Sequence, residues 1–146
     1  MSTASAARPV ILHVLESYGA GSARAAEGFA AATPEFRHVV LRHRRDGESV
    51  DGQAERAFDE VLDLPAAPLA AMRTIRRTVR RIVPRRIHAH SSYAGAYVRL
   101  ALPRGVARRA VVYSPHCFAF ERQDLPAPAR AAFRVVERAL DRKSVV

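Results

Sequence analysis

Hydrophobic and polar positions along this chain fall into alternating strand-like and helix-like segments. Short apolar runs at residues 10–15 and 36–43 are typical of buried strands, and a glycine-bearing turn follows the first of them. Between the two runs, an alanine-rich segment ending at Ala32 favours a helix that Gly21 or Ser22 caps. The start of the chain therefore predicts a strand, a helix and a second strand.

The most regular pattern lies at residues 69–83, where apolar side chains recur at helical spacing. The opposite face of this predicted helix carries Arg73, Arg76, Arg77, Arg80 and Arg81. Two interpretations remain open. The helix packs its apolar face on a sheet and leaves the arginines in water, or it lays a basic face on an anionic membrane surface.

The rest of the chain continues the alternation. We expect strands at residues 61–64, 86–90 and 110–114 and helices at residues 53–58, 92–102 and 128–140. Strands that alternate with helices indicate βαβ units with right-handed crossovers. The pattern therefore predicts an α/β fold with a parallel sheet.

Composition and charge narrow the choice of partners. The 146 residues are 49% hydrophobic, which suits one globular domain. The net charge of +10 and the pI near 11.2 are typical of nucleic-acid-binding domains. However, every basic residue except Lys143 is arginine and alanine is abundant, so GC-rich coding explains the bias. We therefore expect no nucleic-acid partner.

The remaining composition points to the cytoplasm. Cys117 is the only cysteine, so no intrachain disulfide forms. Residues 1–9 lack the apolar stretch of a signal peptide, and we expect residues 1–8 to be disordered. No apolar run reaches the roughly 18 residues of a transmembrane helix.

Three loops follow predicted strands, at residues 17–22, 90–95 and 114–120. In a parallel sheet, ligands bind where loops leave the carboxyl ends of the strands. The first loop carries Gly19-x-Gly21, whose glycines permit positive φ and a close approach of phosphate to the next helix.

This glycine turn departs from a dinucleotide-binding fingerprint. Arg24 stands where a third small residue is needed, and His43, Arg44 and Arg45, rather than an acid, follow the second strand. These residues exclude an NAD site. An NADP site that uses Arg44 or Arg45 remains an alternative, as does a turn without a ligand.

His88 and His90 lie two residues apart, so both point to one face of a strand. With His116 they form a candidate metal trio, but no Asp or Glu stands near these three histidines in the sequence, and backbone groups often satisfy histidines on a buried strand. We expect no metal here, and expect His90 and His116 to bond a ligand. Cys117 points away from His116 and is expected to be a half-buried hydrophobe.

Segments 10–21, 87–95 and 112–118 together resemble the N-terminal half of a family-four glycosyltransferase, in the family's order and spacing. The resemblance covers residues 9–140. It implies a Rossmann-like three-layer domain with a mainly parallel sheet, which is the acceptor-binding half of a GT-B enzyme. The sequence departs from the family at Cys117, where glycine is usual, and at Ala20, where many members have glycine.

The resemblance also implies the functional residues. The turn approaches the donor diphosphate, and the end of the 86–90 strand lines the acceptor side. The implied substrate-binding residues are Gly19, Ala20, Gly21, Ser22, His90, Ser91 and Ser92, and the implied catalytic residue near the transferred sugar is His116.

The implied activity is that of a retaining hexosyltransferase. It transfers sugar from a nucleotide-diphosphate sugar, its co-substrate, to a glycan, lipid-linked or small-molecule acceptor, with no metal or other cofactor. The family's donor site lies in a second Rossmann-like domain with a Glu-x7-Glu motif, which this sequence lacks. We therefore expect a truncated fragment that is inactive alone.

Residues 141–146 are expected to be a non-native tail, because they match one translated frame of a sequencing-adapter oligonucleotide. The whole enzyme would be cytoplasmic, with peripheral contact to the inner membrane face through the arginine-rich helix. Two other functions stay open: a stand-alone binding module for anionic lipid or polymer, and a small NADP-dependent enzyme.

Overall fold

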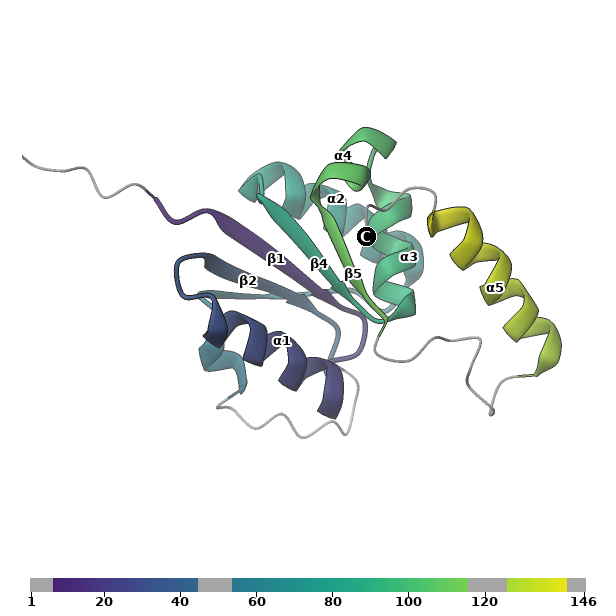
Figure 1. Cartoon of the computed structure of the whole chain (residues 1–146), viewed down its shortest axis with the longest axis horizontal. Coiled ribbons are helices and arrows are strands. Elements are labelled where there is room, and N and C mark those ends of the chain that lie inside the picture. Colours follow the sequence, from purple (N-terminus) through teal and green to yellow (C-terminus); the bar gives the residue numbers. More distant parts are fainter. Residues whose placement is uncertain (1–6, 45–53, 116–125, 142–146) are drawn as a thin grey trace, which may run out of the picture.

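The chain folds into a parallel sheet between two layers of helices, as the computed structural model shows for residues 7–44, 54–115 and 126–141 (Figure 1). The strands are β1 (Val10–Leu15), β2 (Arg37–Arg42), β3 (Glu60–Asp63), β4 (Arg86–His90) and β5 (Val111–Ser114). They form a five-stranded sheet in the order β3-β2-β1-β4-β5, and every pair of neighbours is parallel. The predicted α/β, Rossmann-like three-layer fold is confirmed.

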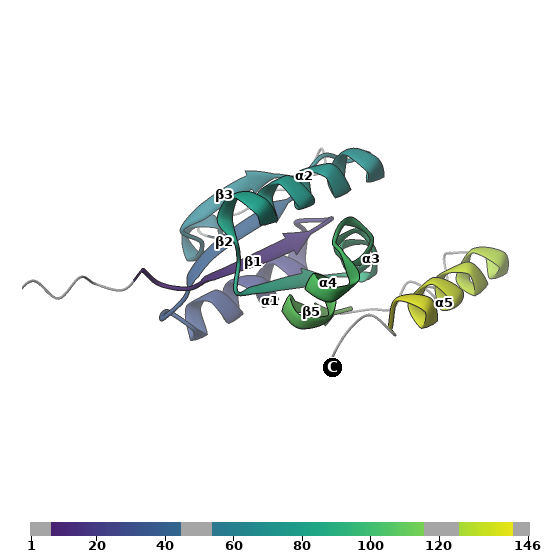
Figure 2. The same ribbon diagram turned by 90° about the horizontal axis from the view of Figure 1, so that it is seen from above.

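Helices cover both faces of this sheet (Figures 1 and 2). The helices are α1 (Ala20–Ala32), α2 (Pro68–Ile82), α3 (Ser92–Ala101), α4 (Arg104–Ala110) and α5 (Ala127–Asp141), and a short 3-10 helix, η1, spans Ala54–Ala57. On one face, α1 packs Ala26 and Ala30 against Leu15 and Val40. On the other face, α2 and α3 cover a core that contains the following buried residues: Leu12, Val14, Val39, Leu41, Ile75, Ile87 and Val98. Both cores form because the central strands present buried apolar side chains to each face of the sheet.

Most predicted elements are present with small shifts at their ends, but two local expectations are wrong. Neither Gly21 nor Ser22 caps α1, which begins at Ala20 with Gly19 as an extended N-cap that makes no side-chain hydrogen bond. Ser22 Oγ instead donates to the carbonyls of Ser17 (3.1 Å) and Gly19 (3.2 Å). Helix α4 was not predicted, since its short sequence has no apolar periodicity.

A buried arginine attaches α5 to the rest of the domain. Arg99 of α3 is 1% exposed, and its Nε donates to the Gly95 carbonyl at 2.9 Å. Its Nη2 pairs with Glu137 of α5 at 3.0 Å, and its guanidinium lies 4.4 Å above the Tyr113 ring. The Tyr113 hydroxyl donates to Glu137 at 2.8 Å. A buried charge requires such partners, so Glu137 fixes α5 beside α3 (Figure 2).

Gly95 gives the sharpest test of this packing. A Cβ at Gly95 would lie 2.5 Å from the Tyr113 ring, whose hydroxyl is bonded to Glu137. Gly95→Ala should therefore lower the free energy of unfolding by about 1–3 kcal/mol, as overpacking does. The matched control is Gly28→Ala in α1, where a Cβ meets no atom within 4 Å. Urea unfolding should show a gain of about 0.5–1 kcal/mol for this control, and equal effects of the two substitutions would contradict the packing described.

Candidate functional site

The candidate site lies where the chain changes direction across the sheet. From β1 the chain passes to β2 on one side, whereas β4 lies on the other side of β1. Leu15 and His90 are register partners, so β1 and β4 end level with each other. Helices α1 and α3 both begin just beyond these ends. A crevice at such a switch point, with two helix N-termini, is the expected place for an anionic ligand in a parallel sheet.

A buried side chain and backbone hydrogen bonds hold the loop after β1 in place. Tyr18 is 2% exposed, and its amide donates to the His43 carbonyl at 3.1 Å. The His43 amide donates to the Leu15 carbonyl at 2.9 Å. The glycines permit positive φ but do not adopt it: the φ of Gly19 is −108°, and the φ of Gly21 lies outside the left-handed region. Gly21 is exposed with open space around its backbone, which leaves room for a ligand at the start of α1.

The loop after β4 contains the strained residue. Ser91 has φ 104° and ψ 157°, a conformation that is essentially restricted to glycine and costs about 1–3 kcal/mol. Its amide donates to the Ser114 carbonyl at 3.0 Å, and its Oγ accepts from the Ala94 amide at 3.3 Å as the N-cap of α3. Ser92 is buried, with its Oγ 3.3 Å from the Tyr113 hydroxyl. Strain of this kind concentrates at functional sites.

Beneath these loops lies a set of buried imidazoles that we call the histidine stripe. It comprises His13 of β1, His38 of β2, and His88 and His90 of β4, all between 0% and 7% exposed. His13 is the register partner of His88, so the rings share the sheet face under α1. The rings of His88 and His90 lie 3.9 Å apart, and Phe29 of α1 meets His88 edge-on at 5.0 Å. The sequence identified His88 and His90 as neighbours, but not His13 or His38.

Three members of the stripe are joined in series. His38 Nε2 lies 2.8 Å from the Thr33 carbonyl, which only accepts, so this nitrogen must donate. In neutral rings, His38 Nδ1 then accepts from His13 Nε2 at 3.1 Å. His13 Nδ1 in turn accepts from His90 Nε2, also at 3.1 Å. The Thr33 carbonyl at the end of α1 thus sets the tautomers of three rings, as far as the carboxyl end of β4.

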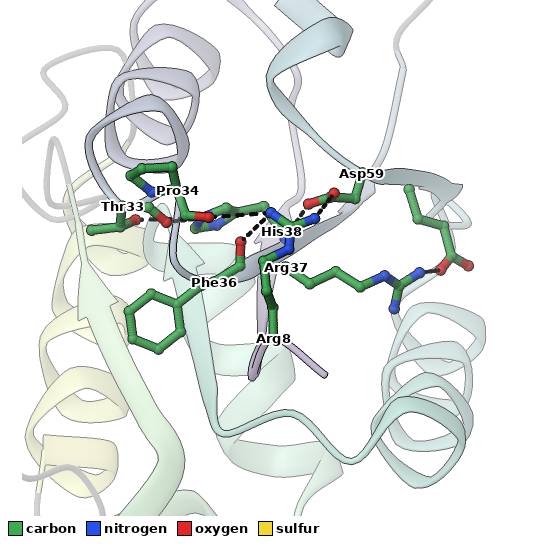
Figure 3. A network of polar contacts seen from close by, with 8 residues as sticks. Arg8, Thr33, Pro34, Phe36, Arg37, His38 and Asp59 are labelled. Atoms are coloured by element: carbon green, nitrogen blue, oxygen red, sulfur yellow. Dashed lines mark hydrogen bonds and ion pairs between the residues drawn. The ribbon is translucent and has the colours of Figure 1, made fainter. Parts of the chain in front are cut away.

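A polar network secures the other end of the stripe (Figure 3). Arg8 donates to the carbonyls of Pro34 (3.2 Å) and Phe36 (3.0 Å) and forms an ion pair with Asp59. Asp59 accepts from the His38 amide at 2.8 Å. A hollow of about 210 Å³ next to these residues lies at the opposite end of β2 from the switch point. This network holds β2 and the loop after α1 in place.

The arginine-rich helix α2 lies on the sheet, as one of its two interpretations predicted. Its buried residues Ala71, Ile75 and Thr78 face the core. Arg81 donates to Glu60 of β3 at 2.7 Å, and this ion pair links α2 to the edge strand of the sheet. Arg73, Arg76, Arg77 and Arg80 are exposed. Among the described helices, none has the length and apolarity needed to cross a bilayer.

The structure therefore groups two predicted sets of residues at adjacent strand ends: the turn at residues 19–22 and the segment at residues 90–92. His90 is 1% exposed and therefore belongs to the core. Ser91, the next residue, is partly exposed and can contact a ligand. His116, the predicted catalytic residue, and Cys117 lie outside the residues that the structure describes.

Compared with known proteins, the chain matches no family model and no curated protein sequence. The case for a function therefore depends on the resemblance in three motifs and on the geometry of the switch point.

The histidine stripe makes stability depend on pH. Burial lowers the pKa of His13 from 6.5 to about 3. As pH falls below 6.5 the unfolded chain takes up this proton and the folded chain does not. The stability contributed by His13 is therefore complete above pH 6.5 and is lost progressively toward pH 3, at about 1.4 kcal/mol per pH unit.

Urea unfolding of chelator-treated protein between pH 7 and pH 4 measures this slope. His13→Gln should flatten it, and His43→Gln, which changes a half-buried imidazole bonded to the Leu64 carbonyl, should leave it unchanged. An unaltered slope in His13→Gln would contradict the assignment.

Ser91 gives a test of strain. Ser91→Gly should raise the free energy of unfolding by about 1 kcal/mol or more, because glycine adopts the same φ without strain and is a tolerable N-cap. Ser91→Ala keeps the strain and loses the cap, so it should lower stability by about 1 kcal/mol. Thermal unfolding of the two variants beside the wild type separates these effects, and a destabilised Ser91→Gly would show that the backbone is unstrained.

Proposed function

We propose that this domain is the acceptor-binding half of a glycosyltransferase that moves a sugar from a nucleotide-sugar donor to a glycan, lipid-linked or small-molecule acceptor. The observation that carries the proposal is the strained Ser91, the N-cap of α3, at the switch point beyond which α1 also begins. The motifs that resemble the glycosyltransferase family include both loops of this crevice.

The first loop is suited to phosphate. The amides at the start of α1 carry the positive end of the helix dipole, and Gly21 leaves the approach open. A donor diphosphate bound there would be neutralised by backbone dipoles and by Arg24, which is exposed on the same helix. This chemistry needs no divalent cation at the diphosphate.

The second loop is suited to sugar hydroxyls. Ser91 Oγ accepts from Ala94, so its own hydroxyl hydrogen remains available to a ligand. His90 cannot move without breaking the imidazole series, and it thereby fixes the position of Ser91. Small rigid groups that hold a hydroxyl in one orientation are what an acceptor site requires. His116 would act from its own loop near the transferred sugar.

A second candidate function is binding to anionic lipid or polymer. It is favoured by four exposed arginines on one helix: Arg73, Arg76, Arg77 and Arg80. This contact is compatible with the first function, since a lipid-linked acceptor lies at a membrane surface. The NADP alternative is weaker, because Glu55 and Asp63 bind Arg42 where a 2′-phosphate would approach Arg44.

The test of the proposed function begins with the gene. Genomic sequence beyond the codon for Leu140 should continue into a second Rossmann-like domain with a Glu-x7-Glu motif. The full-length product should release nucleotide diphosphate from one member of a panel of nucleotide sugars when an acceptor is present. Ser91→Gly should lower kcat/KM, because the rim loses its hydroxyl, whereas Arg76→Glu should leave transfer to a small soluble acceptor unchanged.

The 146-residue chain alone should bind sugars only weakly and show no turnover. Saturation-transfer NMR with sugars and nucleotide sugars measures the first statement, and nucleotide release measures the second. Turnover by the chain alone, or a genomic stop codon directly after Val146, would overturn the proposal.

A further inference from the structure

Three members of the histidine stripe converge closely enough to bind one ion. His13, His88 and His90 each offer a ring nitrogen, and these three atoms lie within 4.8 Å of one another. One pair of ring nitrogens, His13 Nδ1 and His90 Nε2, is 3.1 Å apart. We propose that His13, His88 and His90 bind a divalent transition-metal ion of the zinc class between the sheet and α1. This inference is independent of the proposed sugar transfer.

The spacing fits tetrahedral coordination. With Zn–N distances of about 2.0–2.1 Å, two ligand nitrogens in a tetrahedral site lie about 3.4 Å apart. The His13–His90 pair therefore needs to open by only a few tenths of an ångström. The widest separation, at most 4.8 Å, needs a modest rotation of one ring. Adjacent parallel strands hold the backbone in place, because His13 and His88 are register partners.

Two of these rings, those of His13 and His88, already have the hydrogen-bond partners that metal-bound histidines require. His13 Nε2 donates to His38, which donates to the Thr33 carbonyl. His88 Nε2 lies 2.8 Å from Ser114 Oγ. A second hydrogen bond of this kind fixes the ring of a metal-bound histidine and its tautomer. Two of the three proposed ligands therefore have outer partners already.

Metal binding would replace one hydrogen bond without a net change of protons. The His13–His90 bond uses the hydrogen on His90 Nε2. When the ion binds, His90 takes its other tautomer, with the hydrogen on Nδ1, and Nε2 supplies its lone pair. All three ligands then coordinate as neutral imidazoles.

The donor set also selects the metal. Imidazole nitrogens suit zinc, copper, nickel and cobalt, whereas magnesium and calcium need oxygen ligands. Within the described residues, the group contains three histidines and no carboxylate. Water would occupy the fourth position. Phe29 contacts the rings of His13 and His88 edge-on and is itself 39% exposed, so it reaches from the cluster to the surface.

The sequence expectation of no metal grouped His88 and His90 with His116. The structure instead supplies His13 as the third ligand, from the neighbouring strand. An ion at this point would join β1 to β4 directly beneath Ser91, and would raise the stability of the folded state by its binding energy.

Titration of the chelator-treated chain with Zn²⁺ and with Co²⁺ tests the proposal. We expect saturable binding of one ion per chain, a raised unfolding midpoint, and a Co²⁺ absorption spectrum of tetrahedral type. Mg²⁺ and Ca²⁺ should produce none of these changes. X-ray absorption of the zinc-loaded wild type should show imidazole nitrogens around the ion, and this measurement does not depend on any variant.

Variants locate the ion. His38→Gln removes only the outer partner of His13 and should weaken Zn²⁺ binding about 10–100-fold. His90→Gln removes a ligand and should weaken it further. His43→Gln, outside the stripe, should have no effect. If His90→Gln does not fold, as far-ultraviolet circular dichroism would show, the wild-type spectra decide the question. Binding at several sites, equal loss in His43→Gln, or no saturable binding would overturn the proposal.

Discussion

The fold depends on giving hydrogen-bond partners to a row of imidazoles buried in the core of a parallel sheet. A central strand that is buried on both faces is normally a continuous apolar run. Here alternate positions of β1, β2 and β4 carry histidine, and each unsatisfied polar group buried in this way costs about 1–3 kcal/mol. The chain meets this requirement with a one-way series that ends on the Thr33 carbonyl. The end of α1 and three strands therefore depend on one set of tautomers.

The same series explains how a strained residue persists at the switch point. Ser91 follows His90 directly, and His90 is held by His13. On its other side Ser91 is bound to Ser114 through its amide and to α3 through its cap. A conformation that costs about 1–3 kcal/mol survives only where its surroundings fix it from several directions. The buried stripe and the loop that contains Ser91 are thus coupled, and a ligand at Ser91 would meet a prearranged backbone.

The layered fold could be predicted because each strand of the sheet is a short apolar run that is followed or preceded by a helical pattern. The exact ends of the helices and strands, and the polar part of the core, could not be predicted from the sequence. His13 and His90 are separated by 77 residues, and only the pairing of β1 with β4 brings them together. One signal was present: His13 and His38 each stand inside an apolar run, on the alternating positions that share a face. The strain at Ser91 had no signal in the sequence, because positive φ is expected at glycine and not at serine.

The strongly basic composition is partly a structural requirement. Arg99 binds Glu137 in the core, Arg42 binds Glu55 and Asp63 at the end of β2, and Arg81 shares Glu60 with Arg37 at the sheet edge. Each of these arginines has a partner that fixes an element, so none indicates a polyanion. Among the described residues, Arg73, Arg76, Arg77 and Arg80 place four further exposed charges on the single helix α2. Net charge alone therefore overstates the attraction to nucleic acid, because it counts arginines that already have a carboxylate partner within the domain.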